Sequence, residues 1–273
     1  MRRQKTFRHV IGCVGVGLHS GARVGLTLRP AEAGTGVRFR RADRPGSAAI
    51  PARLDHLREG SGGTGLGTGS TPTVRAIEHL MAALLACEID NALVEISGPE
   101  LPLMDGSARP FVLLIECAGT VEQDAPVAQL ELLRPIAVAE GGRHARLEPA
   151  AGLHLTLTDA AATPARSFAF SFSPEACKRE LVAAREAGCL ETGNGDPDPR
   201  FADEPARHAA LDALGDLALI PARLHARYVG TAADAALRRR LLRRLLRERD
   251  AWRLTGPTPP PPAGGAAAYP LAC

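Results

Sequence analysis

Apolar and polar residues alternate along the start of the chain, from about Phe7 to Arg41, and glycines separate the alternating runs. Alternation with a period of two is typical of strands that bury one face, and glycines between short runs favour tight turns. The pattern predicts a meander of short strands over this region. Similar strands are expected at residues 92–96, 129–139, 145–148, 153–157, 168–172 and 219–229.

Apolar residues at helical spacing predict the helices. Thr71 and Pro72 have the residue types of a helix cap and a first helical position, so we expect a helix from there to about Cys87. Glu78 and His79 then lie in its middle. Four further helices are expected at residues 109–117, 174–187, 204–217 and 232–253.

Strands followed by helices occur twice along the chain, which indicates an α+β protein with two domains of similar construction. Each domain is expected to be an α/β sandwich, in which a strand-rich sheet packs on helices. We place the N-terminal α+β domain at residues 1–122 and the C-terminal α+β domain at residues 123–254. Residues 255–273 are rich in proline and alanine, and we expect them to form an extended or disordered tail.

The charged residues exclude one class of partner. Of the 33 basic side chains only Lys5 and Lys178 are lysines, and the formal net charge is +3. Surfaces that bind nucleic acid combine a basic stripe with aromatic residues, and no such stripe is present, so no nucleic-acid partner is expected. The densest arginine run, residues 238–249, is interpreted as the solvated face of an amphipathic helix. Peripheral contact with the anionic inner-membrane surface is the alternative for this run, and a monomer is expected.

Cysteine usage and the lack of targeting signals predict a cytoplasmic location. The six cysteines are scattered without CxxC pairs in a chain too long to need disulfides, so we expect reduced thiols in the core. The N-terminal sequence has no apolar stretch of signal-peptide length. No window approaches the roughly 18 apolar residues of a membrane span.

Two short motifs carry candidate chemistry. A helical histidine such as His79 is by itself more often a surface residue than a ligand. His208 and Asp212, however, stand at i and i+4, so their side chains share one helix face and can reach one ion. Together with His79 they offer two nitrogens and one oxygen, a set that suits Zn²⁺ with a fourth position open for water. Glu78, next to a ligand, can then accept the proton of that water.

The sequence around these residues resembles one family closely: the zinc-dependent UDP-3-O-acyl-N-acetylglucosamine deacetylases of lipid A synthesis. The resemblance covers the first domain almost continuously. It is carried by Gly15-Val-Gly-Leu-His-Ser-Gly21, Thr27-Leu-Arg-Pro30, Thr35-Gly-Val37, Ile77-Glu-His-Leu80, Ile89-Asp-Asn91, Pro99-Glu-Leu-Pro-Leu-Met-Asp-Gly-Ser107 and the segment from His208 to Asp216.

The resemblance implies a fold and a set of roles. Two α+β domains would pack together with zinc between them, held by His79, His208 and Asp212, and Glu78 would act as general base. The reaction implied is removal of the acetyl group from a UDP-linked, 3-O-acylated glucosamine, so the expected partner is a small N-acyl amino-sugar substrate. Asp105, in the Met-Asp-Gly-Ser motif, would lie in the shell around the metal ligands.

Three positions depart from the family pattern. The family has a lysine after the second histidine ligand, where this chain has Ala209. Glu186 stands where a threonine of the family donates a hydrogen bond. The late histidine that acts as general acid corresponds to Ala235, so the catalytic residue Asp216 keeps its place while the acid that it orients is absent.

The departures predict altered or reduced activity. The segment between Gly188 and His208 is also shorter than in the family, which removes part of the enclosure of the acyl chain. His19, in the matching glycine turn, is the first candidate for a replacement acid, and His225 is expected to be a strand residue instead. We therefore predict a divergent paralogue that is a zinc-dependent amidohydrolase. The alternatives are a non-catalytic zinc-binding relative that binds ligand or regulates lipid A synthesis, and the orthodox deacetylase with other residues in the lost roles.

Overall fold

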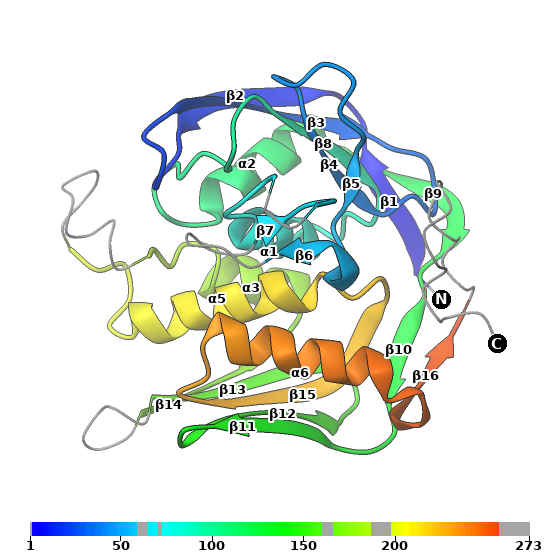
Figure 1. Cartoon of the computed structure of the whole chain (residues 1–273), viewed down its shortest axis with the longest axis vertical. Helices are drawn as coiled ribbons and strands as arrows, with labels where there is room; N and C mark the ends of the chain where they lie inside the picture. Colours follow the sequence, from blue (N-terminus) through cyan, green and yellow to red (C-terminus); the bar gives the residue numbers. More distant parts are fainter. Residues whose placement is uncertain (1, 59–64, 70–72, 160–165, 187–197, 257–273) are drawn as a thin grey trace.

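The computed structural model describes residues 2–58, 65–69, 73–159, 166–186 and 198–256. Two large sheets form opposite sides of the molecule, and the helices lie between them (Figure 1). The prediction of an α+β protein is confirmed. The order of layers is sheet, helices, helices, sheet, and the central contact is between helix α1 (Glu78–Ala86) and helix α5 (Glu204–Leu217).

The first sheet contains the strands predicted for the start of the chain. Its order is β2-β3-β8-β4-β5, and only the β4–β8 pair among these is parallel. Its strands are β2 (Ile11–Val16), β3 (Arg23–Pro30), β4 (Val37–Arg41), β5 (Ile50–Pro51) and β8 (Ala92–Ile96). A small ladder beside it joins β6 (Leu57–Arg58) to β7 (Gly65–Leu66).

The second sheet contains the predicted strands, but one of them is divided and one further strand was not predicted. Its path is β11-β12-β15-β10-β16, and β13 pairs with both β14 and β15. The single strand expected at 129–139 is divided around Pro135, which has no N–H to give to a ladder. The strands are β10 (Gln129–Leu132), β11 (Ile136–Glu140), β12 (Arg143–Pro149), β13 (Leu153–Asp159), β14 (Arg166–Ser171), β15 (Arg223–Thr231) and β16 (Trp252–Thr255).

Strand β16 lies where the last helix was expected to continue. Helix α6 (Ala235–Arg247) ends earlier, because Glu248 leaves the helical region with φ −86° and ψ 77°. A short 3-10 turn, η2 (Arg249–Ala251), follows, and β16 then pairs with β10. The predicted helix from 232 to 253 is therefore corrected to a helix, a turn and an edge strand.

The expected start of the helix that carries Glu78 and His79 is also wrong. Val74 forms a bridge with Leu66, and Ala76 takes a positive φ of 54°, so the helix cannot pass through these residues. Helix α1 begins at Glu78, which places the pair in its first turn. Thr71 and Pro72, the predicted start, lie outside the described residues.

The remaining helices agree more closely with expectation. Helix α2 (Arg109–Ala118) and helix α5 match their predicted spans within one residue. Helix α3 (Pro174–Glu180) is shorter than predicted, and Ser173 caps it by accepting a hydrogen bond from the amide of Ala176. A further 3-10 turn, η1, covers Leu54–His56.

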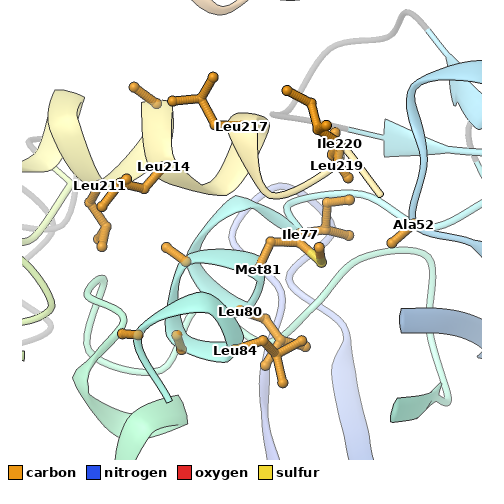
Figure 2. Packing of buried hydrophobic residues seen from close by; sticks show 14 of the residues in the cluster. Ala52, Ile77, Leu80, Met81, Leu84, Leu211, Leu214, Leu217, Leu219 and Ile220 are labelled. Carbon is orange, nitrogen blue, oxygen red and sulfur yellow. The ribbon is translucent and has the colours of Figure 1, made fainter. Parts of the chain in front are cut away.

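Apolar side chains fill the contact between α1 and α5. Figure 2 shows Ile77 and Met81 on the α1 side and Leu211 and Leu214 on the α5 side. All four are 3% exposed or less. Burial of this kind contributes about 1.5–3 kcal/mol per large side chain, so the two helices are held as one unit.

The segment between the two sheets is itself a strand. Strand β9 (Thr120–Pro126) contains the predicted domain boundary at residue 122 and pairs antiparallel with β1 (Arg3–Phe7). The start of the chain thus adheres to the connection between the two halves. The division into two domains stays a prediction.

The cysteines and the membrane expectation can be compared with the structure. Cys13, Cys87, Cys117 and Cys177 are free thiols. Only Cys177 among these is buried, and Cys117 is exposed near the end of α2, so the expectation of core thiols is wrong for part of the set. Among the residues that the structure describes, none of the helices is long and apolar enough to cross a membrane.

Candidate metal centre

Three side chains converge between α1 and α5. His79 comes from the first turn of α1, and His208 and Asp212 come from one face of α5. The two Nε2 atoms of the histidines are 2.9 Å apart, and Nε2 of His79 is 3.4 Å from Oδ1 of Asp212. One ligand atom from each residue lies within 4.8 Å of the other two. The structure therefore brings the three predicted ligands together.

A glycine permits this convergence. Gly215 lies on α5 where the helix crosses the backbone of Glu78, and a Cβ added there would lie 2.2 Å from the Glu78 carbonyl oxygen. No other residue type allows the two backbones to approach this closely. The contact sets the distance between the first turn of α1 and the ligand face of α5.

The residues fit a metal ion. Oδ1 of Asp212 is shielded from solvent and makes no hydrogen bond within the described part of the chain. A buried carboxylate oxygen without a donor is costly, and a cation removes the cost. Two imidazoles and one carboxylate are the donor set of many catalytic zinc sites, with one position left open.

Charges and burial shift the pKa values at this centre. Burial raises the pKa of Glu78 to about 7, and the charge of Asp212 acts in the same direction. Burial lowers the pKa of His208. Burial also acts to lower the pKa of His79. The contact of His79 with Asp212 and the negative charges of Glu78 and Glu186 act in the opposite direction and are stronger, so the pKa of His79 is raised. Glu78 can therefore exchange a proton near neutral pH.

Asp216, one turn beyond Asp212, is held by an arginine. It is fully buried, and its Oδ2 accepts a hydrogen bond of 2.8 Å from Nε of Arg238 on α6. The residue Arg238 is 5% exposed, and its guanidinium cannot release its proton in a protein. The carboxylate that sequence reasoning left without a partner thus has a permanent cation as its partner.

Asp105 also has an arginine partner. Its Oδ1 accepts hydrogen bonds from the amide and hydroxyl of Ser107, and its Oδ2 accepts one of 2.9 Å from Arg200. The hydrogen bonds to Ser107 and Arg200 outweigh burial and keep the pKa of Asp105 low. Arg200 lies shortly before α5, and its side chain also contacts the hydroxyl of Ser107, so it joins this part of the chain to the Met-Asp-Gly-Ser turn.

The position of Glu186 is fixed by its neighbours. Its amide donates to the carbonyl of Gly106, and Arg185 before it forms a buried ion pair of 3.0 Å with Glu204 of α5. Its negative charge acts on both His79 and His208. The residue that we expect to depart from the family pattern is therefore close enough to the two histidines for its charge to act on them.

The histidine predicted as a replacement acid is not part of the convergent group. Nδ1 of His19 lies 3.2 Å from Oε2 of Glu100, and the fully buried Glu100 also accepts hydrogen bonds from the amides of His19 and Ser20. This pairing fixes the turn after β2. His225 is a residue of β15, as predicted.

Sequence reasoning missed Arg238, Arg200 and Gly215. A signal existed for Arg238, because residues 237, 238, 241, 242 and 245 share the buried face of α6 and only one of them is polar. No comparable signal marks Arg200, since its partner lies 95 residues away.

Comparisons with known proteins agree with this geometry. A family model described as "LpxC: UDP-3-O-acyl N-acetylglycosamine deacetylase" matches residues 4–194 and 190–247. The chain belongs to this family. It is 37% identical over 287 residues to the UDP-3-O-acyl-N-acetylglucosamine deacetylase of Acidithiobacillus ferrooxidans, with 92% of each chain covered. Enzymes of the same name from Stenotrophomonas maltophilia and Legionella pneumophila are 37% and 36% identical, with 92–93% of each chain covered.

The positions at which we expect this chain to depart from the LpxC pattern have defined places in the fold. Ala209 is exposed on α5 directly after His208, and Ala235 is the first residue of α6. Asp234 before it caps α6 by accepting a hydrogen bond from the amide of Leu237. None of these three side chains is among the groups that converge on the metal centre.

Proposed function

We propose that this chain is a zinc-dependent amidohydrolase that removes an acyl group from an N-acyl amino sugar, with lower activity than its LpxC relatives. The observation that carries the proposal is the convergence of His79, His208 and Asp212, one carboxylate oxygen of which accepts no hydrogen bond from the residues that the structure describes. The substrate named for the relatives is a UDP-3-O-acyl-N-acetylglucosamine. We extend to this chain the class of that substrate, an N-acyl amino sugar linked to UDP.

The residues divide the work as follows. Zinc held by the three ligands would supply Lewis-acid polarisation of the amide carbonyl and of the attacking water. Glu78 follows the N-terminus of α1 and adjoins the ligand His79, so its carboxylate is placed to accept the proton of that water. Its pKa of about 7, raised by burial, also lets the resulting acid return a proton near neutral pH. Amide hydrolysis consumes one water and yields a carboxylic acid and an amine.

Lower activity is supported by what surrounds this core. Ala209 carries no donor for the oxyanion, and Glu186 brings negative charge toward a site where negative charge develops. Arg238 engages Asp216 and has no proton to give. Loss of one oxyanion donor reduces the rate by about 10²–10³, and loss of a positioned general acid by about 10²–10⁴. We therefore expect turnover at least about 10³-fold below that of an ordinary relative.

An acetate-release assay tests this proposal. The substrate is UDP-3-O-acyl-N-acetylglucosamine labelled in the acetyl group, zinc is saturating, and the Acidithiobacillus ferrooxidans enzyme is run alongside. The expected result is slow release that Glu78→Gln abolishes, because the glutamine keeps the shape of the side chain and loses the base. Release within about tenfold of the relative would contradict lowered activity.

The same assay separates the alternative functions. If neither wild type nor Glu78→Gln releases acetate while zinc remains bound, the chain is the non-catalytic zinc-binding relative instead. Ala209→Lys sharpens the result, since a restored donor should raise the rate by about 10²-fold in an active enzyme and leave a non-catalytic one silent. The cytoplasmic location, the monomeric state and peripheral membrane contact stay predictions.

A further inference from the structure

One cavity lies away from the proposed metal ligands. It is a cavity of about 840 Å³ between the first half of the chain and the strands around β10 and β15. None of Glu78, His79, His208 and Asp212 is among its lining residues. Its apolar wall includes Met81, Leu84, Leu85, Phe172, Leu217 and Leu224. A volume of this size is that of a small-molecule site.

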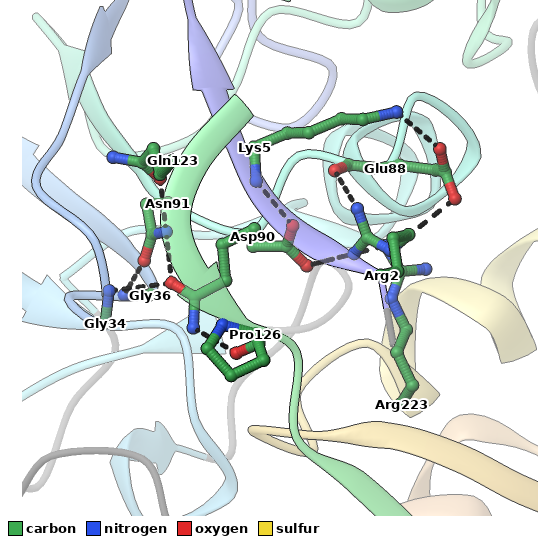
Figure 3. Close-up of polar contacts among 11 residues, drawn as sticks. Arg2, Lys5, Gly34, Gly36, Glu88, Asp90, Asn91, Gln123, Pro126 and Arg223 are labelled. Atoms are coloured by element: carbon green, nitrogen blue, oxygen red, sulfur yellow. Dashed lines mark hydrogen bonds and ion pairs between the residues drawn. The ribbon is translucent and has the colours of Figure 1, made fainter. Parts of the chain in front are cut away.

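The charged residues that line the cavity are four arginines (Arg2, Arg38, Arg53 and Arg223) and three carboxylates (Glu88, Asp90 and Asp124). Figure 3 shows Arg2, Arg223 and the nearby Lys5 around the carboxylates of Glu88 and Asp90. Lys5, which is not part of the cavity wall, pairs with Glu88 at 2.8 Å, and Arg2 pairs with Asp90 at 2.5 Å. Arg223 therefore shares its carboxylate with a second cation.

Arg223 is the cation left with the weakest partner. Its guanidinium lies 3.5 Å from Oδ1 of Asp90, the same oxygen that Arg2 contacts at 2.5 Å. The other oxygen of Asp90 accepts a hydrogen bond from the amide of Lys5. Burial and the neighbouring Arg2 hold the pKa of Arg223 below its usual value. An added anion would relieve this excess of positive charge.

A second arginine on the cavity wall also has a donor that an anion could use. Arg38 lines the cavity, and its Nε is shielded from solvent with no hydrogen-bond partner among the residues that the structure describes. Its Nη2 makes one long contact of 3.4 Å with a backbone carbonyl. The polar part of the cavity thus offers donors, and its larger part offers apolar side chains.

We propose that this cavity is a second ligand site for an amphiphilic anion, a single carboxylate or phosphate head group carried on an apolar chain. The head group lies against the guanidinium of Arg223, and the chain lies against Leu84, Leu85 and Phe172. The site is independent of amide hydrolysis. It lies against the same helices as the metal centre, because α1 provides both His79 and Leu85.

Isothermal titration with sodium decanoate and with decyl phosphate tests the site on the full chain. We expect saturable binding of one or both, and the tighter of the two identifies the head group. Decanol, which has the same chain and no charge, should bind at least about tenfold more weakly, since a hydrogen bond to a charged group is worth about 1.5–3 kcal/mol.

Two arginines on one strand give a matched pair of variants. Arg223→Met should weaken decanoate binding at least about tenfold, whereas Arg227→Met, exposed on the same strand and absent from the cavity wall, should change it less than about twofold. Leu85→Glu, on the partly exposed wall of α1, should also weaken binding, because it places a like charge beside the ligand. This variant keeps the test decisive if Arg223→Met does not fold.

One more variant tests whether decanoate binds at the metal centre instead of the cavity. Carboxylates also bind metal ions, so His79→Ala, which removes a proposed ligand, should bind decanoate as wild type does. Binding that is lost in His79→Ala, equal effects of Arg223→Met and Arg227→Met, or no saturable binding of either anion would each overturn the proposal.

Discussion

Helix α5 carries two aspartates one turn apart, and their surroundings differ. Asp216 is fully buried and is compensated by the guanidinium of Arg238 at 2.8 Å. Asp212 faces two imidazoles, and its shielded Oδ1 makes no hydrogen bond in the described part of the chain. A buried carboxylate that is paired with a guanidinium indicates a structural role, whereas a buried oxygen that faces imidazoles and accepts no hydrogen bond indicates a place kept for a ligand. We therefore expect that disrupting the Asp216 pair mainly lowers stability, whereas replacing Asp212 mainly lowers zinc binding.

The largest effect on stability is expected when the ion pair between Arg238 and Asp216 is broken. Arg238→Met leaves the carboxylate of Asp216 buried without its compensating cation, which should lower the free energy of unfolding by about 3–5 kcal/mol in urea denaturation. The double variant Arg238→Met with Asp216→Leu should recover most of this loss, because an apolar pair of similar volume needs no compensation. A single variant within about 1 kcal/mol of wild type would show that Asp216 does not depend on Arg238.

The next effect concerns the contact that brings Asp212 to His79. Gly215→Ala places a Cβ against the Glu78 carbonyl, so we expect a loss of about 1–3 kcal/mol and weaker zinc binding together. Ala209→Ser, exposed on the same helix, is the control and should change stability by less than about 0.5 kcal/mol. Unchanged zinc affinity in Gly215→Ala would mean that helix spacing does not set the ligand geometry.

A pH-dependent effect of intermediate size is expected from Glu78. Burial raises its pKa from 4.5 to about 7, so the metal-free folded protein holds a proton that the unfolded chain has released. The free energy of unfolding should therefore fall as pH rises from about 4.5 to about 7, and Glu78→Gln should remove this part of the slope. Exposed Glu175→Gln is the control. Parallel profiles for wild type and Glu78→Gln would contradict the raised pKa.

The smallest effect on stability is expected at Asp212. In metal-free protein, Asp212→Asn removes a charge whose Oδ1 accepts no hydrogen bond from the described residues and lies 3.4 Å from Nε2 of His79, so the free energy of unfolding should change by less than about 1 kcal/mol or rise. Thermal unfolding with excess chelator measures this. A loss as large as that of Arg238→Met would remove the distinction between the two aspartates.

Much of this site could be predicted because its signals are local. The i, i+4 spacing of His208 and Asp212 fixes one helix face, and α5 spans 204–217 as its apolar periodicity indicates. His79 lies 129 residues from His208, and spacing alone could not join them. The family motifs, which place both histidines around one metal, supplied that link.

The rest depended on contacts that local patterns do not encode. Pro72 suggested a helix start, but the bridge between Leu66 and Val74 and the positive φ of Ala76 prevail and delay α1 to Glu78. The partner of Asp216 is Arg238 on α6, 22 residues further along the chain. The family pattern led us to expect a histidine at the position of Ala235, and the arginine run predicted that Arg238 would be a surface residue. Whether Arg238 is a surface charge or a buried ion-pair partner depends on its burial, which only the tertiary structure defines.

Zinc content tests the central claim most directly. Wild type, Asp212→Ala and Glu78→Ala are reconstituted with zinc, desalted and analysed for metal per chain. We expect about one zinc per chain in wild type and in Glu78→Ala and less than about a tenth in Asp212→Ala, because Glu78 is proposed to adjoin the metal without being a ligand. Less than about a tenth in wild type, or equal loss in both variants, would contradict the assignment of His79, His208 and Asp212 as the ligands.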